Sequence, residues 1–133
     1  AGQSVLIVRG NDAGEEAQAA PAGTGRDWLA QQLQAVGAQA QFVVAYERSA
    51  PVWSAQQTEL AAQAATDGSV WCFSSSQAIQ HLALAMPAQS WAQARCLATH
   101  TRIAQTAQTL GFGEVHLTRP SLMDVLGSLE CLA

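Results

Sequence analysis

The feature that most constrains the fold of this chain is the repeated alternation of short apolar runs with amphipathic segments. Five runs have the length and composition of buried strands, and they span residues 4–10, 40–48, 69–74, 94–99 and 114–119. Strand-like runs that alternate with helical patterns are typical of βα units, whose strands are parallel. We therefore expect one α/β domain over residues 1–133. Its flavodoxin-like, five-stranded parallel sheet would have the order 2-1-3-4-5 and helices on both faces.

The segments between these runs carry signals for the starts and ends of helices. Capping boxes are expected at Ser54 with Gln57 and at Ser74 with Gln77, because each serine is followed three residues later by a glutamine. Residues 11–24 are small and acidic and contain glycine and proline, so we expect a flexible insert there. Further helix boundaries are indicated by Thr24 and Ser121 as N-caps and by Gly37 and Gly111 as stops.

The composition excludes several classes of function. The chain of 133 residues has 10 acidic residues, 6 arginines and no lysine, so no basic stripe is present for nucleic acid. No apolar run approaches the roughly 18 residues of a membrane-spanning helix, and the first residues lack the pattern of a signal peptide. Cys72, Cys96 and Cys131 lack metal-ligand spacing. We expect them to be reduced thiols in a cytoplasmic protein without a metal.

Polar residues gather where the expected strands end. Ligands of open parallel sheets bind at the carboxyl ends of the strands, where the N-termini of the following helices attract anions. We therefore expect a binding site for a carboxylate- or phosphate-bearing ligand, formed by Arg9, Gly10, Ser74, Ser75, Ser76, Gln77, Thr99, His100, Thr101 and Arg102. The alternative is that the hydroxyl residues serve only as helix caps and that Arg9 pairs with a neighbouring acid.

Two other kinds of site on the same fold are excluded by their residues. A flavin site needs a phosphate loop rich in hydroxyls and glycine after the first strand, but the loop here is long and acidic. A receiver domain needs an aspartate at the end of the third strand and a lysine at the end of the fifth. Ser74 stands at the first of these positions, and the chain has no lysine.

Four passages, taken in order, resemble the family of uroporphyrinogen-III synthases in its C-terminal half. They are SVLIVRG at 4–10, V-x-x-Y-x-R at the end of 37–48, Phe-Ser-Ser at 73–75, and His-x-Arg-Ile-Ala at 100–104 followed by Leu-Gly-Phe. Together they cover nearly the whole chain. The sequence departs from the family pattern in the length of the insert 11–24, and at Thr101, where proline is common.

This resemblance implies a fold and a chemistry. Members of the family have two similar α/β domains and bind the linear tetrapyrrole hydroxymethylbilane in the cleft between them. They close it to uroporphyrinogen III with inversion of ring D, without a metal or organic cofactor. Tyr46 matches the tyrosine of the family and is the expected catalytic general acid. Its alternative role is packing at the connection between domains. The polar residues at the strand ends would bind the carboxylates of the substrate.

The resemblance also raises the question of completeness. In the family, residues like 4–10 belong to one domain and the chain after Tyr46 belongs to the other, so we expect a fragment that is inactive without an N-terminal half. Its first unit would either fold back into a single compact domain, which we favour, or extend through 42–50 as a hinge or connecting strand into a swapped homodimer. Two functional alternatives remain: a non-catalytic α/β module that binds an anionic small molecule, and an interaction domain that uses the Ala/Gln-rich helix 54–66.

Overall fold

The computed structural model describes residues 2–12 and 27–133 of the chain. The chain divides into two compact units, Ala1–Ala50 and Pro51–Ala133. The described residues form parallel strands and five helices, which confirms the expected mixed α/β class. Among them, no helix combines the length and the apolar character that crossing a membrane requires.

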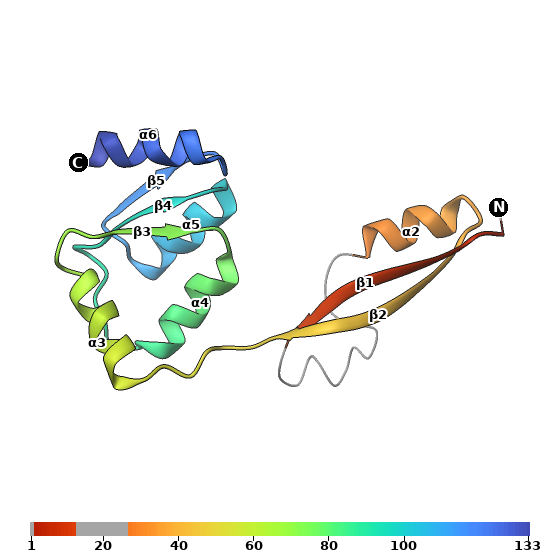
Figure 1. Cartoon of the computed structure of the whole chain (residues 1–133), viewed down its shortest axis with the longest axis horizontal. Helices are drawn as coiled ribbons and strands as arrows, with labels where there is room; N and C mark the ends of the chain where they lie inside the picture. Colours follow the sequence, from red (N-terminus) through yellow and green to blue (C-terminus); the bar gives the residue numbers. More distant parts are fainter. Residues whose placement is uncertain (1, 13–26) are drawn as a thin grey trace. The chain divides into compact units, whose positions relative to one another are not determined.

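The first unit is one βαβ motif. It contains β1 (Ser4–Asp12), α2 (Trp28–Ala35) and β2 (Gln39–Arg48), and the two strands pair in parallel (Figure 1). Alternate β1 residues are half-buried, whereas Leu6 and Val8 between them are 60% and 62% exposed. The guanidinium of Arg9, on the half-buried face, donates to Asp27 Oδ1 at 2.9 Å, next to the first residue of α2. Helix α2 therefore covers one face of this two-stranded sheet.

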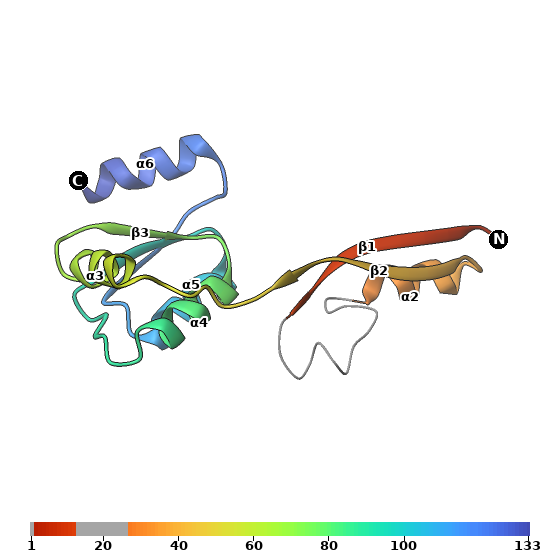
Figure 2. The ribbon, with the colours of Figure 1, turned by 60° about the horizontal axis from the view of Figure 1, so that its bottom comes forward.

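The second unit is a three-stranded parallel sheet with helices on both sides. In chain order it contains α3 (Ala55–Ala64), β3 (Val70–Phe73), α4 (Ser76–Ala85), β4 (Arg95–Ala98), α5 (Thr101–Leu110), β5 (Glu114–Leu117) and α6 (Leu122–Leu132). The strand order is β3-β4-β5, with Trp71, Cys96 and Val115 aligned across the sheet. Helix α6 lies on the opposite side of this sheet from α4 and α5 (Figures 1 and 2).

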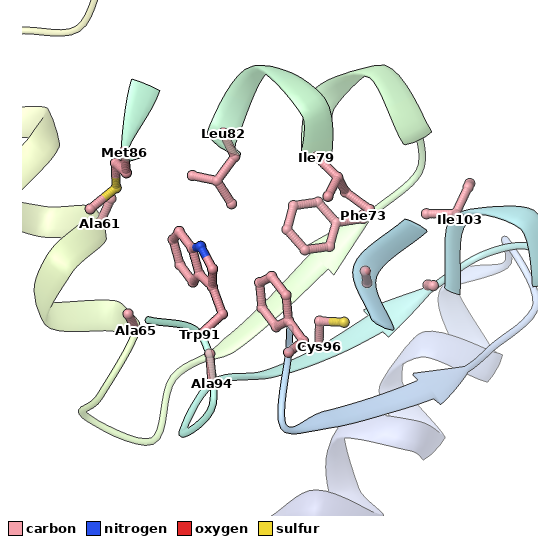
Figure 3. Packing of buried hydrophobic residues seen from close by; sticks show 13 residues of the cluster. Ala61, Ala65, Phe73, Ile79, Leu82, Met86, Trp91, Ala94, Cys96 and Ile103 are labelled. Atoms are coloured by element: carbon pink, nitrogen blue, oxygen red, sulfur yellow. The ribbon is translucent and has the colours of Figure 1, made fainter. Parts of the chain in front are cut away.

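The core of the second unit lies between the sheet and helices α3, α4 and α5 (Figure 3). Aromatic rings fill its centre: Trp91 and Phe112 stack with their centroids 5.2 Å apart, and Trp71 meets the Trp91 ring edge-on at 5.3 Å. The indole N–H of Trp71 donates to the Ala64 carbonyl at 3.1 Å, so this polar atom is satisfied beside the core. The tight packing of rings and small residues fixes the positions of the strand ends described below.

Two hydrogen-bonded contacts hold α6 to the other side of the sheet. The guanidinium of Arg95 donates to the Leu132 carbonyl at 2.8 Å and also to the Gly68 carbonyl, and the Ser128 hydroxyl donates to Thr118 Oγ1 at 3.2 Å. Leu97, which alternates with the core residues on its strand, is fully buried on this side. The last helix therefore covers this side of the sheet and has polar contacts to it at two points, although none of its own residues is buried.

The expected single five-stranded sheet, in the order 2-1-3-4-5, is wrong. The hydrogen-bonded sheets are β1-β2 and β3-β4-β5, and β1 is not a neighbour of β3. The physical reason for the error is that local hydrophobic patterns identify strands but do not specify which strands pair. In the structure, α3, the helix between β2 and β3, belongs to the second unit, where its Ala61 and the following Ala65 join the core.

Most of the expected helix boundaries are confirmed. Ser54 and Gln57 form both hydrogen bonds of a capping box, and Ser121 caps α6 by accepting from the backbone N–H of Asp124. Gly111 ends α5 with φ 110°, and Gly37 follows α2 with φ 86°, in the left-handed region that favours glycine.

One capping box is wrong, and one segment is only partly described. Ser75, not Ser74, is the N-cap of α4, and its hydroxyl accepts from the backbone N–H of Ala78 at 3.3 Å. Strand β1 continues to Asp12, two residues into the expected insert. Residues 13–24 of that insert lie outside the described residues. The expected N-cap Thr24 is wrong, because α2 begins at Trp28 and its N-cap is Asp27.

Candidate functional site

In the second unit, the carboxyl ends of β3 and β4 lie next to each other. The two strands are paired in parallel up to Phe73 and Ala98, and the backbone N–H of Thr99 donates to the Phe73 carbonyl at 3.2 Å. This bond places the two strand-to-helix turns side by side. The structure therefore brings together eight of the residues expected from the sequence: Ser74, Ser75, Ser76, Gln77, Thr99, His100, Thr101 and Arg102.

Each of these turns leads into a ten-residue helix that begins with a side-chain cap. Ser75 caps α4, and His100 caps α5 by accepting from the backbone N–H of Arg102 at its Nδ1, over 3.1 Å. Because Nδ1 accepts, the proton of a neutral His100 ring is on Nε2, where it can be donated to a ligand. His100 thus has a capping role that its position at the rim did not reveal.

The electrostatic surroundings of the two helix starts favour an anion. Neither α4 nor α5 has an acidic residue in its first turn. The free N–H groups and the positive end of the helix dipole are therefore not already neutralised there. Ser74, Thr101 and Arg102 are exposed to solvent, and Thr99 is half-buried. This arrangement can present hydroxyls, backbone donors and one guanidinium to a carboxylate without a positive net charge on the chain.

In the first unit, Arg9 is occupied by other contacts. Its guanidinium forms an ion pair with Asp27 at 2.9 Å and stacks over the Phe42 ring, with Cζ 3.9 Å from the ring centroid. The structure thus gives Arg9 the acidic neighbour that the alternative interpretation foresees. A role for Arg9 in binding a substrate stays a prediction.

Gly10, Tyr46 and Arg48 form a cluster at the carboxyl ends of β1 and β2. A bulge between Arg9 and Gly10 shifts the register, so that Tyr46 stands opposite Gly10. Gly10 is buried, while the Tyr46 side chain is 57% exposed. A guanidinium N–H of Arg48 donates to the Tyr46 hydroxyl oxygen at 3.2 Å. The Tyr46 ring therefore packs against Gly10 and is exposed to solvent, with the Arg48 guanidinium beside its hydroxyl oxygen.

The cysteines differ in their surroundings. Cys72 and Cys131 are exposed and Cys96 is buried, and all three are free thiols. Burial, assisted by the nearby thiol of Cys72, raises the pKa of Cys96 to about 11. Cys96 is therefore a neutral core residue. In the described part of the chain, no three histidine, cysteine or acidic side chains are grouped as metal ligands.

Among the grooves formed by the described residues, two lie where helices pack against the sheet, and the sequence did not indicate them. One, of about 520 Å³, lies between α3 and β3, with Trp53 and Trp71 in its lining. The other, of about 540 Å³, lies against α6, with His116 and Cys131 in its lining. Both depend on how helices pack against the sheet, which local periodicity does not specify.

The fold defines a class of protein. Parallel strands connected by helices are the arrangement of α/β proteins, whose ligands commonly bind at the carboxyl ends of the strands. The family model described as uroporphyrinogen-III synthase HemD matches residues 1–123, and the chain belongs to this family. No curated protein matches the chain.

Proposed function

We propose that this chain supplies the C-terminal half of a uroporphyrinogen-III synthase, which cyclises hydroxymethylbilane to uroporphyrinogen III with inversion of ring D. The observation that carries the proposal is the family match over residues 1–123. The activity is that of a lyase in tetrapyrrole and haem biosynthesis. Hydroxymethylbilane closes without inversion when it is left alone, so the protein must control the conformation of the bilane and the position of its electrophilic carbon.

The strand ends of the second unit suit the carboxylates of this substrate. The turns before α4 and α5 offer backbone N–H groups and the hydroxyls of Ser74, Ser76, Thr99 and Thr101, with no acid in the first turn of either helix. Binding through helix N-termini explains how a chain with net charge −4 can meet a polyanion. Arg102 adds a cation at the same rim, and His100 adds a ring N–H.

Tyr46 is the residue that we propose as general acid. Its exposed hydroxyl would protonate the departing hydroxyl of the hydroxymethyl group, so that the group leaves as water. Tyr46→Phe removes the proton while keeping the ring. The variant is therefore expected to lose about a hundredfold in the rate of type III formation, within the usual contribution of a positioned general acid.

The two-stranded sheet of the first unit is consistent with a need for a further polypeptide. Two hydrogen-bonded strands are few for independent stability, and Leu6 and Val8 on β1 are mostly exposed. We propose that an N-terminal half completes the enzyme, with a second copy of the chain in a swapped homodimer as the alternative. Light scattering distinguishes the two, because only the homodimer doubles the mass of the chain alone.

An isomer assay tests the proposed function. Hydroxymethylbilane is supplied to the chain with and without a separately produced N-terminal half, and the type I and type III products are separated. Type III product in the combined sample supports the enzyme, whereas type I alone in both samples contradicts it. Binding of uroporphyrinogen without turnover would instead indicate the non-catalytic module.

A further inference from the structure

The position of Tyr46 depends on a close approach that only glycine allows. A methyl group added to Gly10 would lie 2.5 Å from Tyr46 Cζ and 2.6 Å from Arg48 Nη1, far inside normal contact distance. Gly10 does not have a positive φ, so the backbone conformation does not call for glycine. Glycine is needed because the Tyr46 phenol and the Arg48 guanidinium occupy the space that a side chain at this position would fill. The bulge beside Gly10 completes the arrangement, because it brings Tyr46 opposite this residue.

The hydrogen bond from Arg48 fixes the direction of the phenol proton. A guanidinium has only donors, so in the 3.2 Å contact the Tyr46 oxygen must be the acceptor. The hydroxyl hydrogen of Tyr46 then points away from Arg48 and is left for another acceptor. The guanidinium carbon also lies 5.5 Å from the centroid of the Tyr46 ring, within the range of a cation–π contact. Two separate contacts therefore hold ring and oxygen.

We infer that Gly10 and Arg48 are positioning residues for Tyr46. Gly10 provides the surface on which the ring rests, and Arg48 turns the hydroxyl proton toward the substrate. The inference rests on the proposed function for the identity of the acceptor, which is the hydroxymethyl oxygen. As the phenol proton moves to that oxygen, the carbon–oxygen bond breaks, its electron pair leaves with water, and the pyrrole nitrogen stabilises the carbon cation. The phenolate then lies beside the Arg48 cation.

Fluorine NMR tests this arrangement without any need for catalysis. Tyr46 is the single tyrosine of the chain, so fluorotyrosine incorporation gives one resonance that reports this ring alone. Arg48→Met is expected to displace the resonance by more than its line width, and Arg48→Lys to move it less. Gly10→Ala is expected to displace it as well, since a methyl group there overlaps the ring.

Matched controls remove the same residue types elsewhere. Arg119→Met removes an exposed arginine from the second unit, and Gly127→Ala adds a methyl group where nothing lies within 4 Å. Both should leave the resonance in place. If Gly10→Ala does not fold, as judged by circular dichroism, the two variants of the half-buried Arg48 still test the role of Arg48. An unchanged resonance in folded Arg48→Met would overturn the role of Arg48, and in folded Gly10→Ala that of Gly10.

A kinetic cycle separates positioning from direct substrate contact. In the active assembly, Arg48→Met should lower kcat about tenfold with KM unchanged, as expected for a misdirected donor. In the Tyr46→Phe background, the same substitution should cost nothing further, because it acts through the missing hydroxyl. A further tenfold fall in kcat on adding Arg48→Met to Tyr46→Phe would overturn the inference. If the parent forms no type III product, the proposed function fails, while the NMR result still judges the positioning of Tyr46.

Discussion

Cys96 makes the stability of the protein depend on pH at the alkaline end. Burial raises the pKa of this thiol from 9.0 to about 11, so the folded chain holds the thiol proton more tightly than the unfolded chain. The contribution of this pKa shift to the free energy of unfolding is therefore fully present below pH 9.0 and is lost as the pH rises toward about 11. Urea unfolding over this range should show that loss in the parent. Cys96→Ala should be less stable throughout but should lose this part of the pH dependence, whereas Cys131→Ala, at an exposed position, should keep it.

Gly113 is a second residue whose missing side chain matters. A methyl group at this position would collide with the backbone of Ala92, lying 2.9 Å from its carbonyl carbon, and backbone cannot turn aside as a side chain can. Gly113→Ala is expected to lower the free energy of unfolding by about 2 kcal/mol. Gly127→Ala is the matched control, because its methyl group enters open space within α6 and should raise stability by about 0.5 kcal/mol. Equal effects of the two substitutions in urea unfolding would contradict this explanation.

At the scale of elements, α4 offers a direct comparison of two adjacent caps. The Ser75 hydroxyl accepts from the Ala78 N–H, so Ser75→Ala should lower the free energy of unfolding by about 1 kcal/mol. Ser74→Ala should have little effect on stability, because Ser75 and not Ser74 caps the helix. Thermal or urea unfolding of the two variants measures the difference. A larger loss in Ser74→Ala would place the helix start one residue earlier than the structure does.

The same helix shows what the sequence could and could not predict about elements. The run of three serines before Gln77 identifies a helix start, but serine is a preferred N-cap at each of these positions. The hydrogen bond from the Ala78 N–H identifies Ser75 as the cap, and it is seen only in the structure. The strands were predictable because β-branched and apolar runs are a local signal. Their pairing was not, because period-two and period-3.6 patterns contain no information on which strand is the neighbour.

In the candidate site too, local features could be predicted from the sequence, but contacts that depend on strand register could not. The strand-end rule correctly placed Ser74 and Thr99 next to each other, because their strands are neighbours in sequence and in the sheet. The contact between the Tyr46 ring and Gly10 could not be predicted, because it depends on a bulge that shifts the register between β1 and β2. Arg48 was visible in the V-x-x-Y-x-R passage, but its hydrogen bond to the phenol required the pairing of the strands.

At the scale of the whole chain, the two units differ greatly in their buried apolar interior. The second unit contains a core of 13 buried residues. Among the described residues of the first unit, only Gly10 and Ala30 are buried, and Leu6 and Val8 expose most of their surface. Since burial of apolar surface is the main favourable contribution to stability, the first unit should open at a much lower free energy than the second.

Hydrogen exchange tests this difference in stability between the units. In the isolated chain, peptides from β1 and β2 should exchange well before peptides from β4, whose Cys96, Leu97 and Ala98 are completely buried. Equal protection of β1 and β4 would contradict the low stability of the first unit. If an N-terminal half completes the protein, its addition should slow exchange at 4–12, because β1 would gain a strand neighbour and a cover for Leu6 and Val8. If a second copy completes it instead, the same slowing should appear on raising the concentration of the chain alone, by mass action.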